Sequence, residues 1–334
     1  MKSYINSISV YLPENTLTNE DLNNEFPEWS VEKISSKTGI FKRTIASDGE
    51  FVSDLAIKAC LKLFEEHSID KNKIDFVLLC TQSPDYFLPT TACIIQDKLG
   101  LSKNCGALDF NLGCSGFVYG LALANGLIAG ETAKNVLLIT SETYSKYINK
   151  KDKSNRTIFG DAAAACLVSS DPSSGGIRKF VFGTDGEGAE NLIVKNGGSK
   201  FALEIGEDIF SEEEFVRNDS NLYMNGQEIF KFTTASVPVL VEDCLEKNNL
   251  TLEDIDLFVF HQANKFMLDY IRRKINIPQD KFFMYFEDIG NTVSSTIPIA
   301  MAEAIAAQKI KKGMKVLIAG FGVGYSFGAT VIEF

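Results

Sequence analysis

The sequence lacks the features that mark membrane proteins, nucleic-acid binders and metalloproteins. Its 334 residues contain no apolar run near the roughly 18 to 20 residues that a membrane span needs. It has only two histidines and no Cys-x-x-Cys pair, and its 33 basic residues are outnumbered by 44 acidic ones. Zinc sites need clustered cysteines and histidines, and nucleic-acid binders are usually basic. We therefore expect neither a bound metal, nor a nucleic-acid partner, nor a membrane span.

Secretion signals and disulfide patterns are also lacking. The opening residues, MKSYINSISVYLPEN, hold one lysine and no small-residue cleavage site, unlike a signal peptide. The seven cysteines are an odd number, are scattered, and mostly lie in apolar runs such as FVLLC and AAAACLV. That pattern suits a reducing compartment and cysteines that pack as small hydrophobic residues. We predict a soluble, cytoplasmic protein.

What the sequence does contain is a weak internal duplication. The similar pairs are NKIDFVLLC with EDIDLFVFH, NVLLITSE with KVLIAGFG, and IFGDAAAACLV with SFGATVIEF. Buried-strand runs alternate with helical patterns in both halves, which indicates an α/β protein. We predict two related halves, residues 1–170 and 171–334, and an insertion near 196–217 that has no counterpart and lies near a pocket.

One cysteine, Cys114, stands among glycines in LDFNLGCSGFVYGLALANGLIAG, residues 108–130. The pattern predicts a strand, a turn and a helix, with Cys114 near the helix N-terminus. The helix dipole favours an anion there by at most about 2 kcal/mol. This predicts a thiol pKa that falls from about 8.5 to about 7, and a nucleophilic Cys114. The alternative is a cysteine that only packs in a glycine-rich core.

The two histidines differ in context. His67, in LFEEHSID, is typical of a surface residue at a helix end. His261 follows the strand-like DLFVF directly and precedes an amphipathic helix pattern. Ligands of α/β sheets bind at the C-terminal edge of parallel strands, which favours a chemical role for His261, although a lone histidine is more often structural.

Two further segments carry polar or glycine signals. Asn291 precedes a small-residue helix pattern, where it is either an N-cap or a neutral hydrogen-bond donor. Gly320, Gly322 and Gly324 alternate after a strand. A dinucleotide-binding loop needs a helix next, but the strand-like TVIEF follows instead. We predict a loop whose backbone N–H groups face an oxyanion.

Together, four segments resemble ketoacyl-acyl carrier protein synthase III of the thiolase-like condensing enzyme superfamily. They are GCSGF around Cys114, HQAN from His261, GNTVSSTIP around Asn291, and FGVGYSFGA near the C-terminus. The resemblance implies a five-layer αβαβα fold with internal duplication, usually a homodimer. It also implies that Cys114, His261 and Asn291 form the catalytic triad. A second catalytic cysteine, as in thiolases, is missing from GFGVG, and Asn291 replaces the second histidine of elongating synthases.

The resemblance implies a decarboxylative Claisen condensation through an acyl-Cys114 intermediate, without a cofactor. The acyl donor would be an acyl-CoA, and the malonyl thioester would be carried by acyl carrier protein. His261 and Asn291 would stabilise the enolate, and backbone N–H groups of Cys114 and Val323 would bind the tetrahedral oxyanion.

Several substrate-binding positions also carry over from the family. These are Gly226 and Asn264 for the pantetheine arm, Leu88 (inserted by a partner subunit) and Phe321 for the acyl pocket, Lys37 and Arg156 for phosphates, and Arg272, Arg273 and Lys274 for docking of the acidic carrier protein. For the last three, a solvated helix end is the alternative, because cations near a helix C-terminus are favourable anyway.

Departures from the family pattern keep a second function open. The family arginine after HQAN is Phe266 here, and the tryptophan that stacks on adenine has no clean match, since Trp29 is offset. The alternative is an acyltransferase of the same fold that passes the Cys114 acyl group to an oxygen, nitrogen or small-molecule acceptor in a specialised pathway. A non-catalytic partner subunit is disfavoured because all three chemical positions are filled.

Overall fold

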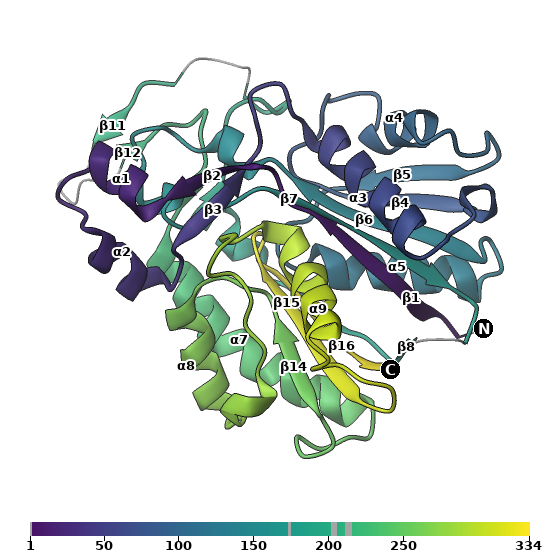
Figure 1. The fold of residues 1–334 in the computed structure, drawn as a ribbon. Coiled ribbons are helices and arrows are strands. Elements are labelled where there is room, and N and C mark those ends of the chain that lie inside the picture. The colour runs from purple at the N-terminus through teal and green to yellow at the C-terminus, as the bar shows by residue number, and fades with distance from the viewer. Residues whose placement is uncertain (1, 173–174, 202–205, 211–215) are drawn as a thin grey trace.

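The computed structural model describes residues 2–172, 175–201, 206–210 and 216–334. Its main feature is a ten-stranded mixed sheet of order β14-β15-β16-β8-β1-β7-β6-β4-β5, with β9 paired to β16 (Figure 1). The strands of the N-terminal half are β1 (Tyr4–Tyr11), β4 (Phe76–Cys80), β5 (Gly106–Phe110), β6 (Asn135–Glu142) and β7 (Ala162–Ser169). Those of the C-terminal half are β8 (Gly175–Ile177), β9 (Val181–Thr184), β14 (Leu257–Phe260), β15 (Lys315–Gly322) and β16 (Ser326–Glu333).

The strand pairings repeat between the two halves. In the first half β4 runs parallel to β6, β6 antiparallel to β7, and β7 antiparallel to β1. In the second half β14 runs parallel to β15, β15 antiparallel to β16, and β16 antiparallel to β9. The three similar sequence pairs fall on β4 and β14, β6 and β15, and β7 and β16, which confirms the internal duplication. We propose that the halves divide near residue 170, between β7 and β8.

Helices form three layers around these strands (Figure 1). The outer layer over the first half contains α3 (Val52–Glu66) and α4 (Thr91–Lys98), and the outer layer over the second contains α7 (Gly226–Lys247) and α8 (Lys265–Ile275). Between the halves lie α5 (Gly116–Ala129) and α9 (Thr296–Ala306), and α5 contacts strands of both halves. Three large clusters of buried apolar side chains lie between the layers, as the predicted five-layer arrangement requires.

The position of each helix follows from its charge content. α5 has no charged residue and α9 has only Glu303, whereas α8 carries Lys265, Asp269 and three cations in its last turn. A helix that is apolar around most of its surface is stable only when most of that surface is covered. The two apolar helices therefore occupy the middle layer, and the amphipathic α8 lies at the outside.

Smaller elements lie outside the main sheet. The pair β2 (Asn15–Thr18) and β3 (Lys42–Ile45) flanks α1 (Asn19–Glu25), which starts with a capping box at Thr18, and α2 (Val31–Thr38). The short pairs are β10 (Leu192–Ile193) with β13 (Tyr223–Met224), and β11 (Ile209–Phe210) with β12 (Val216–Arg217); α6 (Lys153–Arg156) precedes β7.

The predicted insertion, 196–217, lies between β10 and β13. Two parts of it, 202–205 and 211–215, fall outside the described residues. Within the described part of the chain, no helix is both long and apolar enough to cross a membrane.

Candidate active site

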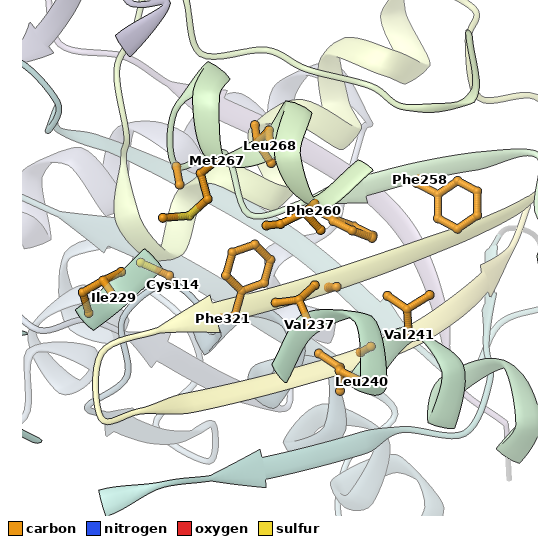
Figure 2. Packing of buried hydrophobic residues seen from close by; sticks show 14 of the residues in the cluster. Cys114, Ile229, Val237, Leu240, Val241, Phe258, Phe260, Met267, Leu268 and Phe321 are labelled. Atoms are coloured by element: carbon orange, nitrogen blue, oxygen red, sulfur yellow. The ribbon is translucent and has the colours of Figure 1, made fainter. Parts of the chain in front are cut away.

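Strand β15 contacts both the cysteine and the histidine. The turn between β5 and α5 carries Cys114, two residues before the helix starts. His261 directly follows β14, and its backbone N–H donates to the carbonyl of Ala319 on β15 at 2.8 Å. The ring of Phe321, two residues further along β15, meets the His261 ring edge-on at 5.6 Å. Figure 2 shows Cys114 at one end of the apolar cluster that contains Phe321.

The alternating glycines let β15 approach Cys114 closely. A Cβ on Gly322 would lie 2.9 Å from Cβ and 3.0 Å from Sγ of Cys114, and one on Gly320 would lie 2.8 Å from the carbonyl oxygen of Cys114. Successive residues of a strand point to opposite faces, so residues 320 and 322 share the face that meets the cysteine. The prediction of a glycine loop is therefore wrong for these two glycines, which are strand residues. Gly324 does lie in the turn before β16, with φ +134°.

Asn291 is positioned by backbone contacts with the other half of the chain. Its N–H donates to the carbonyl of Ile158 at 2.8 Å, and its carbonyl accepts from Gly160 at 3.0 Å. Gly290 precedes it with φ +77°, a conformation that favours glycine. α9 starts five residues after Asn291, with Ser295 as its N-cap, so Asn291 does not serve as the helix cap.

The side chains of His261 and Asn291 meet, and both residues are buried. Asn291 Nδ2 lies 3.5 Å from His261 Nε2, while Asn291 Oδ1 accepts from the N–H of Val293 at 2.9 Å. His261 Nδ1 lies 2.8 Å from the hydroxyl of Thr296. The structure thus places the imidazole Nε2 and the amide NH2 side by side. His67, by contrast, is the C-cap of α3, as the sequence predicts.

Burial reverses the expected ionisation of the cysteine. The Cys114 side chain is 5% exposed, and burial together with the nearby Glu142 carboxyl raises the pKa of its thiol to about 12. Burial lowers the pKa of His261 to about 3. The predicted thiol pKa of about 7 is wrong, because loss of hydration outweighs a helix dipole worth at most about 2 kcal/mol. At neutral pH both groups are uncharged.

Sequence reasoning missed a buried glutamate beside the site. Glu142, the last residue of β6, accepts from the hydroxyls of Ser83 at 2.8 Å and Ser294 at 3.0 Å, and from the N–H of Gln82 at 3.1 Å. Burial raises the pKa of Glu142 to about 8. The available signal was a polar residue that ends an apolar strand, which is the signal that identified His261.

A cavity of about 670 Å³ opens next to the cysteine. Gln82 and Val323 line it, and a Cβ on Gly113 would lie 2.6 Å from a side-chain atom of each, so these two residues border the turn that carries Cys114. Asn196, Gly197 and Gly198, at the start of the predicted insertion, also line the cavity, as its expected place near a pocket requires. Most of the lining near β10 is apolar.

Comparison with known proteins identifies the family. The family model described as 3-oxoacyl-[acyl-carrier-protein (ACP)] synthase III matches residues 108–186, and the model of its C-terminal part matches residues 245–334. Beta-ketoacyl-[acyl-carrier-protein] synthase III of Clostridium perfringens (strain ATCC 13124) is 38% identical over 324 residues, which cover 97% of each chain. The chain belongs to this family.

Solved structures of the family agree with the fold. A crystal structure of a 3-oxoacyl-(acyl-carrier-protein) synthase III has 46% identity and a TM-score of 0.97, with both chains covered completely. The synthase III of Thermus thermophilus has 34% identity and a TM-score of 0.88, with 99% of each chain covered. The thiolase-like fold and the condensing-enzyme class predicted from the sequence are confirmed.

The expected acyl and pantetheine positions lie in different surroundings. Phe321 is buried beside His261, and Leu88 is 82% exposed on the loop before α4. Gly226 is the exposed first residue of α7. Asn264 is the N-cap of α8, and its Oδ1 accepts from the Met267 N–H at 2.9 Å.

The expected phosphate-binding residues already have neighbours. Arg156 pairs with both carboxylate oxygens of Glu25. Lys37 lies over Trp29, with its ammonium 5.1 Å from the ring centroid, and Trp29 is itself only 9% exposed. Phosphate binding by Arg156 would require exchange of the Glu25 carboxylate, so both assignments stay predictions.

The cations predicted to dock a carrier protein differ in exposure. Arg272 is half-buried and donates to the carbonyl of Ile277, two residues past the end of α8, at 3.0 Å. Arg273 and Lys274 are exposed. Phe266, which stands where the family pattern has an arginine, is 59% exposed and stacks on Phe230 with ring centroids 5.5 Å apart.

Proposed function

We propose that this chain condenses an acyl thioester with a malonyl thioester, with loss of carbon dioxide, through an acyl group held on Cys114. The observation that carries this proposal is the approach of His261 Nε2 to Asn291 Nδ2, 3.5 Å apart, with both residues buried and with β15 in contact with His261 and with Cys114. Two uncharged donors at one point suit a negative charge that develops on a carbonyl oxygen.

The first half-reaction transfers the acyl group to sulfur. The Cys114 thiol attacks the thioester carbonyl of an acyl-CoA, and the bond to the CoA sulfur breaks. The proton that leaves Cys114 ends on the departing CoA thiolate, so the protein gains no net charge. Backbone N–H groups of Cys114 and Val323 are the proposed donors to the tetrahedral oxyanion, each typically worth about 3 to 4 kcal/mol in such sites.

The second half-reaction forms the carbon–carbon bond. His261 and Asn291 donate to the thioester carbonyl of the malonyl group, and the carbon–carboxylate bond breaks to release carbon dioxide. The resulting enolate attacks the acyl-Cys114 carbonyl, and collapse of the oxyanion expels the cysteine sulfur, which takes up a proton. All transferred atoms come from the two thioesters, so the reaction needs no cofactor.

The partners remain part of the proposal. We infer acyl-CoA as donor and a malonyl group on acyl carrier protein, with Arg273 and Lys274 as exposed cations for that acidic protein. We also propose a homodimer, because Tyr86, Phe87 and Leu88 form a loop that is 61%, 80% and 82% exposed. Burial of such an apolar loop by a second copy would remove it from water. Light scattering during size exclusion tests this, with a mass near 37 kDa as the contrary result.

The decisive experiment follows each half-reaction separately. The protein is incubated with a panel of acyl-CoAs, and the mass added to the Cys114 peptide is measured. Malonyl-carrier protein is then added and carbon dioxide is collected. Cys114→Ala should not be acylated, whereas the control Cys93→Ala should behave as wild type. Asn291→Ala should load acyl groups almost normally but lose decarboxylation.

Two results would change the proposal. Acylation of Cys114→Ala at the wild-type rate would remove the nucleophile assignment. Acylation of the wild type without carbon dioxide release, but with transfer to an oxygen, nitrogen or small-molecule acceptor, would favour the acyltransferase of the same fold.

A further inference from the structure

The His261 ring is held at Nδ1 by one hydroxyl group. Among the described residues, Thr296 is the hydrogen-bond partner of this nitrogen, with Nδ1 and Oγ1 2.8 Å apart. His261 is 3% and Thr296 1% exposed. A neutral imidazole carries its single ring proton on either Nδ1 or Nε2. The group that meets Nδ1 therefore decides whether Nε2 donates or accepts.

The Thr296 hydroxyl can turn its proton toward the ring at little cost. It has one proton and two acceptors in reach, Nδ1 at 2.8 Å and the Val293 carbonyl at 3.0 Å. That carbonyl also accepts from the backbone N–H of Thr296. When the hydroxyl proton points at the ring, the carbonyl keeps a donor, so no buried polar group is left unpaired.

The position of Asn291 favours a proton on Nε2. Because Oδ1 of Asn291 accepts from the Val293 N–H, the NH2 group of the amide is the half that faces His261. If Nε2 were an acceptor, a normal N–H···N hydrogen bond would draw the two nitrogens together. Their separation of 3.5 Å is longer than the roughly 2.7 to 3.2 Å of good hydrogen bonds, as expected for two donors that converge on a shared acceptor.

The backbone around Val293 supports both contacts. Val293 has φ +55°, in the left-handed region that β-branched residues rarely adopt. This conformation lets its N–H reach Asn291 while its carbonyl reaches Thr296. A strained residue thus connects the groups that orient both donors, and such strain concentrates where geometry serves function.

We propose that the Thr296 hydroxyl donates to His261 Nδ1 and thereby fixes the ring proton on Nε2, which makes Thr296 a positioning residue for the enolate-forming step. The catalytic consequence rests on the proposed decarboxylative condensation, whereas the tautomer itself does not. In this arrangement His261 and Asn291 each present one N–H to the thioester carbonyl. Without the hydroxyl, the proton is free to move to Nδ1. Nε2 is then unprotonated, and its lone pair repels the developing oxyanion.

The tautomer can be measured directly because the chain has only two histidines. Nitrogen-15 NMR of protein labelled at histidine distinguishes a protonated ring nitrogen from an unprotonated one, and His67→Gln assigns the second set of signals. We expect wild-type His261 to be protonated at Nε2, Thr296→Ser to match it, and Thr296→Val, which keeps the β-branched shape, to move the proton fully or partly to Nδ1. Protonation at Nδ1 in the wild type would overturn the proposal, even if no variant folds.

Kinetics separate positioning from a merely structural role. In Thr296→Val we expect decarboxylation of the malonyl thioester to fall about 100-fold, the usual loss for one oxyanion donor, while acyl loading of Cys114 changes less than about threefold. Thr296→Ser should restore decarboxylation. Equal loss of both half-reactions in Thr296→Val, or an unchanged tautomer, would contradict the proposal. If wild type shows the Nε2 proton but releases no carbon dioxide, the proposed function fails while the tautomer assignment stands.

Discussion

Replacement of Glu142 by glutamine should make the protein more resistant to alkaline conditions. Glu142 is fully buried, and its pKa is raised from 4.5 to about 8 by loss of hydration. The folded protein therefore holds this proton more tightly than the unfolded chain does. It follows that stability falls as pH rises from about 4.5 through 8, the reverse of the usual effect of a paired carboxylate.

The size of the effect follows from the difference in pKa. At 1.36 kcal/mol per pKa unit, a change from 4.5 to about 8 corresponds to about 5 kcal/mol of lost stability once the group is ionised. Roughly 2 kcal/mol of this stability is already lost at pH 6, so a further loss of about 3 kcal/mol is expected between pH 6 and pH 9. Glutamine keeps an acceptor for the Gln82 N–H and carries no charge, so Glu142→Gln should avoid this loss.

Urea unfolding at a series of pH values provides the measurement. The difference in unfolding free energy between Glu142→Gln and wild type should grow by about 3 kcal/mol from pH 6 to pH 9. Glu242→Gln, an exposed change on α7, is the matched control and should show no such trend. The variant should also be alkylated faster at Cys114 above pH 8, because the Glu142 charge raises the pKa of that thiol. A difference that stays constant with pH would refute the raised pKa of the buried Glu142.

Three further substitutions test packing, capping and burial. Gly322→Ala places a methyl group 3.0 Å from Cys114 Sγ and should reduce acylation at least tenfold. Mass spectrometry measures the acylation, and circular dichroism shows whether the variant is folded. Normal acylation would mean that β15 moves to make room for the methyl group. Asn264→Ala removes the N-cap of α8 and should lower the free energy of unfolding in urea by about 1 kcal/mol, and Asn264→Ser should restore it. If the Asn264 amide binds pantetheine, KM for the thioester should be raised in both variants. A normal KM in both would remove that role. Arg43→Met leaves the buried carbonyl of Thr157 without the Nε donor at 3.0 Å and should lower the free energy of unfolding by about 1 to 3 kcal/mol. Arg43→Lys is the milder control. No loss of stability in Arg43→Met would mean that another donor replaces Nε.

The elements near the site were predictable because their signals are local. β14 and β6 are apolar runs that end at a polar residue, and α5 starts two residues after the predicted cysteine. The charge-free pattern of α5 indicates a helix that is largely covered, although Leu123 is 42% exposed. These properties depend on neighbours in the chain, so a reading of residues in order recovers them.

The roles of the glycines and of Glu142 were not predictable in the same way. Gly320 and Gly322 resemble a loop motif in sequence, and only the pairing of β15 with its neighbours shows that both face Cys114. In the sequence, Glu142 is only a polar residue at the end of a strand. Its contact with Ser294, 152 positions away, forms only in the folded structure. Which side chains meet across such separations is decided by packing, and no local pattern encodes it.

The amino-acid order alone therefore determined the alternation of strands and helices and the duplication, because periodicity and composition act over a few residues. Its resemblance to a known family singled out Cys114, His261 and Asn291 as the candidate catalytic residues. Tertiary structure decided the charge states of Cys114 and His261 and the orientation of the Asn291 amide. Hydration, which sets whether Cys114 and His261 ionise, is removed only when distant segments close over them, and the hydroxyl that meets His261 arrives from a helix 35 residues further along the chain.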